Sequence, residues 1–130
     1  EKENIQSFET IILGSEQGRN VYKKKLLGLT EQYRLGKFIK FIDHVQEMPK
    51  AYGVVNLVCS CSSEPEAFGR VAVEAQAMEK VIVASDIGGS KETIINNKTG
   101  FLFKAGDAVA LSDLFILANT LLSFDLMSAR

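Results

Sequence analysis

The chain has 130 residues, of which 46% are hydrophobic and 24% are charged, as is usual for a single globular domain. Fifteen basic and sixteen acidic residues give a formal charge of -1, so no global positive field attracts nucleic acid. No apolar run approaches the roughly 18 residues that span a bilayer, and two cysteines with one histidine are too few for a zinc site.

The cysteines, Cys59 and Cys61, are separated by one residue at the end of an apolar run, which places both thiols on one face of a strand. We expect both to be reduced and to lie in or near the core, as in a cytoplasmic protein. The chain begins Glu1-Lys2-Glu3, with neither an initiator methionine nor a signal peptide, which is typical of a fragment of a longer protein.

Strand and helix patterns alternate through the first half of the chain. Short apolar, β-branched runs predict strands, and apolar residues that recur every three or four positions predict an amphipathic helix. In order, the predicted elements are a strand over 8–13, a helix from Tyr22 to Tyr33 that ends at Gly36, a strand over 38–42, a polar piece over 44–52 with some helical character interrupted by Pro49, and a strand over 54–59.

The second half continues this alternation. It predicts a helix over 71–78, a strand over 81–84, a loop over 85–90, a short helix over 91–95, a strand over 99–103 and a long helix capped by Asp107. Alternating strands and helices predict an open, parallel, doubly wound α/β sheet whose strands pair in sequence order.

The helix predicted over 71–78 is apolar on nearly every side, with Val71, Ala75 and Met78 in one stripe. Such a helix is buried. Glu74 lies at the edge of this stripe, and a carboxylate there needs a partner or a function. An ion-paired helix residue and a ligand-binding carboxylate are both consistent with the pattern.

Two loops are expected at one edge of the sheet, because the carboxyl ends of neighbouring parallel strands meet there. One loop covers 60–69 and the other contains Gly88-Gly89. The N-terminus of the helix after the first loop is a natural anion site, and nearby carboxylates accept hydrogen bonds from sugar hydroxyls. These residues predict a phosphorylated, hydroxyl-rich ligand.

Simpler interpretations of the same residues stay open. Glu64 is better explained as an acid that interacts with the helix dipole than as a ligand-binding residue. His44 is better explained as an exposed loop residue than as a catalytic base. Arg70 is either a surface residue or a phosphate clamp, and Gly88-Gly89 is either part of a ligand site or a tight turn.

The runs EPEAFGRVAVEAQAM (64–78) and VIVASDIGGSKETIINNKTGFLF (81–103) resemble the carboxyl-terminal, donor-binding domain of family-4 retaining glycosyltransferases, the glycosyl transferases group 1. The centre of the resemblance is a Glu-x7-Glu motif formed by Glu66 and Glu74. The resemblance implies that residues 1–130 are one partial domain, a Rossmann-like open parallel sheet with helices on both faces. It corresponds to the C-terminal half of the two-domain GT-B fold without its first strand-helix unit.

The resemblance also implies a role for each part of the first run. Glu66 is the catalytic residue and contacts the hydroxyls of the transferred sugar, while Glu74 holds the nucleotide ribose. Backbone amides at the helix start receive the diphosphate, in agreement with the predicted anion site. The implied donor-binding residues are Glu66, Ala67, Phe68, Gly69, Arg70 and Glu74, together with Ile42 and Val45, which contact the nucleobase of the donor.

The implied activity is that of a hexosyltransferase. The full-length protein transfers a sugar from a UDP- or GDP-sugar to a saccharide or lipid acceptor, in the synthesis of cell-envelope polysaccharide, lipopolysaccharide or glycolipid. The acceptor is held by an N-terminal domain outside this chain, so the chain alone is expected to be inactive. No cofactor, metal ion or nucleic-acid partner is expected, and the location is cytoplasmic, with association at the inner face of the membrane left open.

Two other functions stay open: a GT-B sugar-nucleotide epimerase or synthase, and a non-catalytic nucleotide-sugar binding module. The sequence also departs from the family pattern. Ala67, Glu79 and Asp43 stand where glycine is usual, and Val81 stands where proline is usual. Because a left-handed turn costs glutamate about 1–2 kcal/mol, Glu79 predicts a helix that runs longer or exits differently.

Overall fold

The computed structural model describes residues 9–14 and 20–128, and Phe8 of the first predicted strand lies outside these ranges. The chain divides into two compact units, Glu1–Glu47 and Met48–Arg130, which are described separately. The expectation that both belong to one partial domain stays a prediction.

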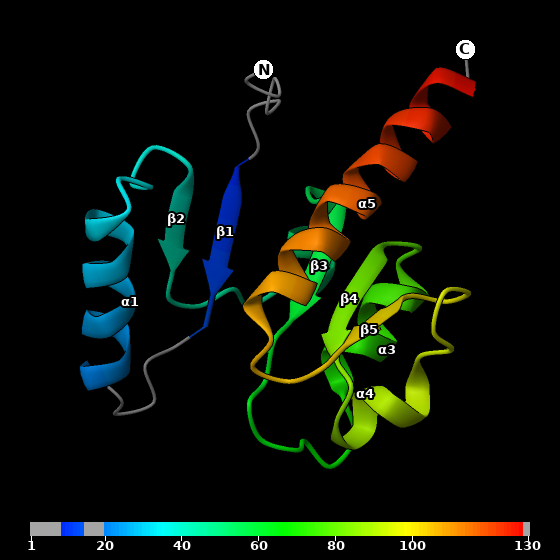
Figure 1. Cartoon of the computed structure of the whole chain (residues 1–130), viewed down its shortest axis with the longest axis horizontal. Helices are drawn as coiled ribbons and strands as arrows, with labels where there is room; N and C mark the ends of the chain where they lie inside the picture. The colour runs from blue at the N-terminus through cyan, green and yellow to red at the C-terminus, as the bar shows by residue number, and fades with distance from the viewer. Residues whose placement is uncertain (1–8, 15–19, 129–130) are drawn as a thin grey trace. The chain divides into compact units, whose positions relative to one another are not determined.

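The first unit contains β1 (Thr10–Leu13), α1 (Asn20–Gln32) and β2 (Ile39–Ile42). The two strands pair in parallel, with Thr10 opposite Ile39 and Leu13 opposite Ile42. Figure 1 shows α1 beside this pair of strands. Asp43, just after β2, accepts a hydrogen bond of 2.7 Å from Nζ of Lys23 on α1, which ties the strand end to the helix.

The second unit contains the remaining elements in the predicted alternation (Figure 1). They are α2 (Met48–Gly53), β3 (Leu57–Ser60), α3 (Arg70–Ala77), β4 (Val81–Ser85), α4 (Gly88–Thr93), β5 (Phe101–Phe103) and α5 (Ala108–Ser128). Its sheet has the order β3-β4-β5, and both pairings are parallel. The predicted pairing in sequence order is confirmed for these three strands.

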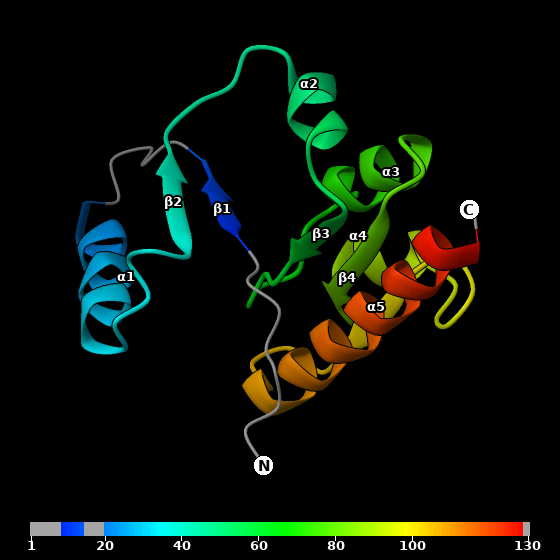
Figure 2. The same ribbon diagram turned by 90° about the horizontal axis from the view of Figure 1, so that it is seen from above.

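The core of the second unit surrounds β4. Three residues of this strand are fully buried: Ile82, Val83 and Ala84. Helices α3 and α5 cover its two opposite sides, as Figure 2 shows. Coverage on both faces explains why the strand is apolar without alternation. The predicted Rossmann-like α/β architecture, parallel strands with helices on both faces, is therefore confirmed.

The strand predicted over 54–59 is shifted in the structure. Val54 is 75% exposed, and the N–H groups of Val54 and Val55 donate to the carbonyl oxygens of Ala51 and Tyr52. These two valines complete the turn that ends α2, so pairing starts only at Leu57, opposite Val81. Their apolar side chains predicted a strand, but their N–H groups are used by hydrogen bonds to α2, so these two residues are not part of β3.

The prediction that Pro49 interrupts the segment 44–52 is wrong. Pro49 is the second residue of α2 and lies in its first turn. An N–H group there would have no acceptor within the helix, so the N–H that proline lacks is not missed. At the other end of the unit the predicted cap of α5 is confirmed, because Oδ1 of Asp107 accepts a hydrogen bond of 2.9 Å from the N–H of Ala110.

The buried face of α3 differs from the predicted stripe. Ala72 and Ala75 are the buried residues, while Val71 is half-buried and Met78 is exposed. The periodicity was ambiguous because apolar residues occupy nearly the whole helix, and only packing against β4 selects the two alanines as the core face.

The exit of α3 also corrects the prediction made from Glu79. The helix ends at Ala77, and Glu79 adopts a φ of 57°, the left-handed conformation that glycine usually supplies. The N–H of Glu79 donates to Gln76 and the N–H of Lys80 donates to Ala75, which is a Schellman motif. These two bonds hold the strained residue, so the helix neither lengthens nor leaves in another direction.

We expect Glu79→Gly to raise the free energy of unfolding by about 1 kcal/mol. The change removes the left-handed strain of about 1–2 kcal/mol, less the backbone entropy that glycine loses on folding. Thermal unfolding measures the effect. Glu79→Ala is the control because it keeps the Cβ atom, and an equal gain in that variant would contradict the strain assigned to Glu79.

Candidate functional site

Two helix N-termini meet at the carboxyl edge of the β3-β4-β5 sheet. The loop that leads into α3 follows β3, and α4 begins shortly after β4. The N–H of Gly89 donates a hydrogen bond of 2.8 Å to the carbonyl oxygen of Glu66, which ties the two segments together. The structure thus brings together the two loops that the topology predicted to be neighbours.

Glycines make this approach sterically feasible. A Cβ atom on Gly69 would lie 2.8 Å from the carbonyl carbon of Gly89, and one on Gly88 would lie 2.5 Å from the carbonyl oxygen of Glu66. A Cβ atom on Gly89 would overlap the backbone of Phe68 and Gly69. The expected loop over 85–90 is therefore wrong in part: Gly88 and Gly89 form the first turn of α4, packed backbone to backbone against the loop before α3.

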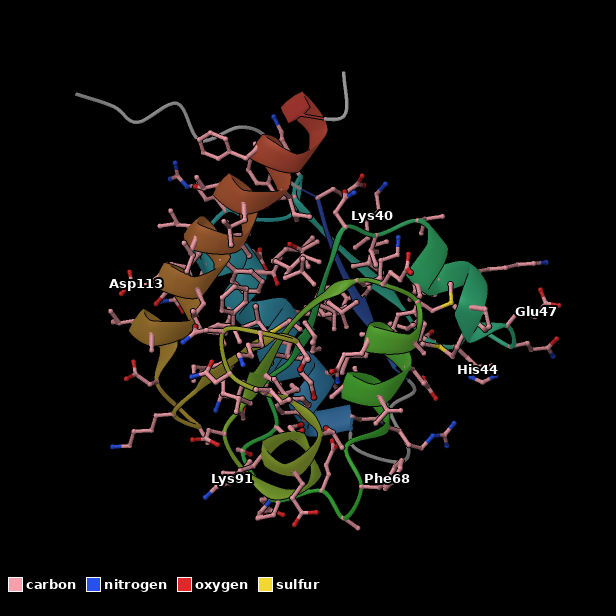
Figure 3. The ribbon with its side chains drawn as sticks, turned by 90° about the vertical axis from the view of Figure 1, so that its right-hand side faces the viewer. Lys40, His44, Glu47, Phe68, Lys91 and Asp113 are labelled. Carbon is pink, nitrogen blue, oxygen red and sulfur yellow. The ribbon has the colours of Figure 1, made fainter. Side chains whose placement is uncertain are left out.

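The start of α3 offers unpaired backbone donors. Gly69 precedes the helix with φ 67° and ψ 48° and has no side chain to cap it. In the described part of the chain the N–H groups of Arg70, Val71 and Ala72 donate to no acceptor, as is usual for the first turn of a helix. Ala67 and Phe68 on the preceding loop are exposed, and Figure 3 shows the Phe68 side chain there. The arrangement can bind an anion.

Glu66 has a fixed backbone and an exposed carboxylate. Its carbonyl oxygen accepts the bond from Gly89, and its Oε1 accepts a hydrogen bond of 2.8 Å from Oγ of Ser62. Ser62 therefore orients one carboxylate oxygen, while the other, Oε2, makes no hydrogen bond among the described residues. An oriented carboxylate with an available oxygen is suited to accept hydrogen bonds from the hydroxyls of a ligand.

Glu74 has the partner that its position on α3 requires. Oη of Tyr52 donates a hydrogen bond of 2.9 Å to its Oε2, and Nη2 of Arg70 donates one of 3.2 Å to its Oε1. The side chain of Glu74 is 34% exposed, so it is not sealed in the core, and that of Arg70 is 81% exposed. Arg70 thus lies on the surface and pairs with Glu74 one turn along the helix.

Tyr52 is the residue that sequence reasoning missed. It is 5% exposed and belongs to the core, although its segment was described as polar. Burial, the hydrogen bond to Glu74 and the charge of Glu74 raise the pKa of Tyr52 to about 12, against the opposing effect of Arg70. A buried tyrosine hydroxyl nearly always finds a partner, which was the signal available in the sequence.

The cysteines lie where β3 enters the loop. Cys59 is half-buried on the strand, whereas Cys61, just beyond it, is exposed, so the expectation of two core or near-core thiols fails for Cys61. Both are free cysteines. The hydrogen bond from Cys59 lowers the pKa of Cys61 to about 6, although burial opposes this, and the same bond raises the pKa of Cys59.

The two residues expected to contact the nucleobase belong to the first unit. Ile42 is the last residue of β2 and is exposed, and Val45 is half-buried in the segment that follows. Their role stays a prediction. His44, between them, is exposed (Figure 3).

The described residues contain no group of three His, Cys, Asp or Glu side chains that could hold a metal ion. Within the same residues no helix combines the length and the hydropathy that a membrane crossing needs.

A parallel α/β unit with an anion-binding helix start and two nearby carboxylates is suited to a phosphorylated ligand that also carries hydroxyl groups. The profile of the family "Glycosyl transferases group 1" matches residues 1–120, and the chain belongs to this family. The predicted resemblance to the carboxyl-terminal domain of these enzymes is thereby confirmed.

Among curated relatives, the capsular polysaccharide biosynthesis glycosyltransferase CapM of Staphylococcus aureus is 30% identical over 122 residues, which are 85% of this chain and 31% of CapM. A glycosyltransferase from Rickettsia africae ESF-5 has a similar structure, with a TM-score of 0.87, 32% identity and coverage of 90% of this chain and 31% of that chain. Anabaena Alr3699/HepE in complex with UDP-glucose has a TM-score of 0.80 and 31% identity, over 86% of this chain and 30% of that chain. The chain spans about a third of the length of these proteins.

We expect Gly89→Ala to lower the free energy of unfolding by about 1–3 kcal/mol, because its Cβ atom has no space against the Phe68–Gly69 backbone. Gly28→Ala is the matched control: nothing lies near its Cβ position inside α1, so that variant gains about 0.5–1 kcal/mol from helix propensity. Thermal unfolding of the full-length protein compares the two. An unchanged melting temperature for Gly89→Ala would contradict the close backbone packing.

The low pKa of Cys61 has a testable consequence for its reactivity. Since the thiolate is the nucleophile, alkylation of Cys61 by iodoacetamide should accelerate through a midpoint well below the ordinary cysteine value of about 8.5. Mass spectrometry of peptides alkylated across a pH series measures this midpoint. Cys59→Ala removes the hydrogen-bond donor and should move the midpoint upward, and a wild-type midpoint near 8.5 would contradict the assignment.

Proposed function

We propose that the full-length protein is a retaining glycosyltransferase and that this chain supplies its donor site. It transfers a sugar from a UDP- or GDP-sugar to a saccharide or lipid acceptor, in the synthesis of a cell-envelope polysaccharide, lipopolysaccharide or glycolipid. Membership of the glycosyl transferases group 1 supports the reaction class. The name of CapM supports polysaccharide synthesis, and the complex of Alr3699/HepE supports a nucleotide-sugar donor.

One observation carries the proposal: the backbone contact between the loop before α3 and the start of α4. It fixes Glu66, through the bond from Gly89, beside the unpaired amides that begin α3. Glu74 follows eight residues after Glu66, on the helix α3 into which this loop leads. A carboxylate, an anion site and a second carboxylate thus follow one another along a short stretch, in the order of the sugar, diphosphate and ribose of a donor.

The diphosphate is the first part of the donor to assign. The amides of Arg70 and of the residues after it that open α3 are aimed along the helix axis at a negative charge. In this assignment the amides of Ala67, Phe68 and Gly69, on the loop just before the helix, also receive the diphosphate. When the bond to the sugar breaks, the departing diphosphate gains charge, and these fixed dipoles stabilise it without rearranging. For that reason we expect no metal ion or cofactor in the reaction.

The two carboxylates hold the hydroxyl-bearing parts of the donor. Glu66, oriented by Ser62, accepts hydrogen bonds from the hydroxyls of the transferred sugar and fixes the anomeric carbon relative to the leaving diphosphate. Glu74 accepts hydrogen bonds from the ribose. For Ile42 and Val45, contact with the nucleobase stays a prediction from the family resemblance. In this assignment Glu66 is the catalytic residue, and the other residues bind the donor.

The location follows from the chemistry of the chain and of its substrate. Free thiols are typical of a reducing compartment, and a lipid-linked acceptor requires access to a membrane surface. We therefore propose a cytoplasmic protein that works at the inner face of the membrane, with the acceptor bound by a part of the protein outside this chain.

We expect Glu66→Gln to lower kcat for sugar transfer about 100-fold in the full-length protein, with a smaller effect on the affinity for nucleoside diphosphate. The amide keeps the shape of the side chain but removes the charge that orients the sugar in the transition state. Steady-state kinetics with UDP- and GDP-sugars measures the change. Glu64→Gln is the matched control, an exposed acid on the same loop to which no role is assigned.

Equal loss in both variants would contradict the role of Glu66. Incubation with donor alone tests the reaction class: conversion of the donor to an isomer would identify an epimerase instead. A wild-type protein that binds the donor but neither transfers nor isomerises the sugar would be a binding module.

A further inference from the structure

We propose that Tyr52 is a positioning residue of the donor site: its hydroxyl holds the Glu74 carboxylate in the orientation that distinguishes a ribose from a deoxyribose. The inference rests on the proposed function, in which Glu74 binds the ribose. It adds a residue from α2 to a site otherwise built from α3, α4 and the loop between β3 and α3.

The ring of Tyr52 is fixed by the core. It is part of the buried cluster that includes Ala72 and Ala75 of α3 and Ile82 of β4. Because the same cluster holds the helix that carries Glu74, the tyrosine and the carboxylate share one rigid support. The hydrogen bond between them joins two anchored groups and does not depend on a flexible surface chain.

The two oxygens of Glu74 have different surroundings. Oε2 takes the hydrogen bond from buried Tyr52, whereas Oε1 faces Arg70, whose side chain is largely exposed. A carboxylate has about four acceptor positions, and these two bonds use two of them. Two positions remain, one on each oxygen. With Oε2 held, the carboxylate plane cannot rotate freely, so these two positions point in fixed directions.

The bond from Tyr52 persists over the working range of pH. The raised pKa of the phenol, about 12, keeps its proton on the oxygen at neutral pH. Tyr52 therefore acts as a donor to Glu74, and a ligand can donate to the one position that remains on each oxygen. Two neighbouring hydroxyl groups on a ribose fit such an acceptor, and a deoxyribose offers one fewer.

A purely structural bond between α2 and α3 is the competing explanation, and it makes a different prediction. Losing a structural bond lowers the stability of the protein and reduces the affinity for all nucleotides equally. Losing a positioning bond reduces the affinity for nucleotides that carry both ribose hydroxyls more than the affinity for those that lack one. The ratio of affinities for ribo and deoxy forms is therefore the informative quantity.

The test uses Tyr52→Phe in the full-length protein, since phenylalanine keeps the buried ring and removes only the hydroxyl. Calorimetry measures Kd for UDP, GDP and their 2′-deoxy and 3′-deoxy forms. We expect wild type to prefer the ribo forms and Tyr52→Phe to reduce that preference about tenfold, the scale of a hydrogen bond to a charged group. Tyr33→Phe is the matched control, because Tyr33 is 64% exposed.

Glu74→Gln gives a second measurement that does not depend on the stability of Tyr52→Phe. It should reduce the same preference, and adding Tyr52→Phe to it should cause little further change, since both act through one carboxylate. A preference that survives Tyr52→Phe while Glu74→Gln removes it would overturn the role of Tyr52 alone. Wild-type protein that binds no nucleoside diphosphate would overturn the proposed function, and this inference with it.

Discussion

The contact between two stretches of backbone, at Gly69 and at Gly88-Gly89, is the constraint on which the rest of the site depends. Neither stretch has room for a Cβ atom against the other, and the N–H of Gly89 closes the contact with a hydrogen bond to Glu66. The contact fixes where α3 begins, and with it the direction of the unpaired amides and the position of Glu66. Side chains could not bring the two helix starts so close, because their volume would separate them.

Beneath this contact, the core supplies the rigidity that the carboxylates need. Small residues at Ala72 and Ala75 let α3 lie close to β4, and the same cluster anchors Tyr52 under Glu74. Glu66 is held in a different way, by its own backbone and by Ser62 on the loop. One carboxylate is therefore supported by the core and the other by a loop. In the proposed reaction this difference in support matches their roles. The ribose stays bound at Glu74, while the sugar at Glu66 is transferred from the diphosphate to the acceptor.

Much of the site could be predicted from particular residues. The spacing of Glu66 and Glu74, the turn residues Pro65 and Gly69, and the carboxyl ends of two parallel strands located the loops and the helix start. The partner of Glu74 could not be predicted, because Tyr52 is close to it only after α2 and α3 pack together. The shape of the turn at Glu79 could not be predicted either: the Schellman hydrogen bonds outweigh a local preference that favoured another conformation.

By itself the sequence determined the class of fold, the order and type of the elements and the family, because alternating periodicity and a spaced motif are local properties of the chain. Tertiary structure decided which apolar residues of α3 are buried, that Gly88 and Gly89 open a helix, and which groups bond to the two carboxylates. These depend on contacts between segments far apart in the chain, such as Tyr52 with Glu74 and Gly89 with Glu66. No local pattern specifies such contacts, since each is chosen by the packing of several elements at once.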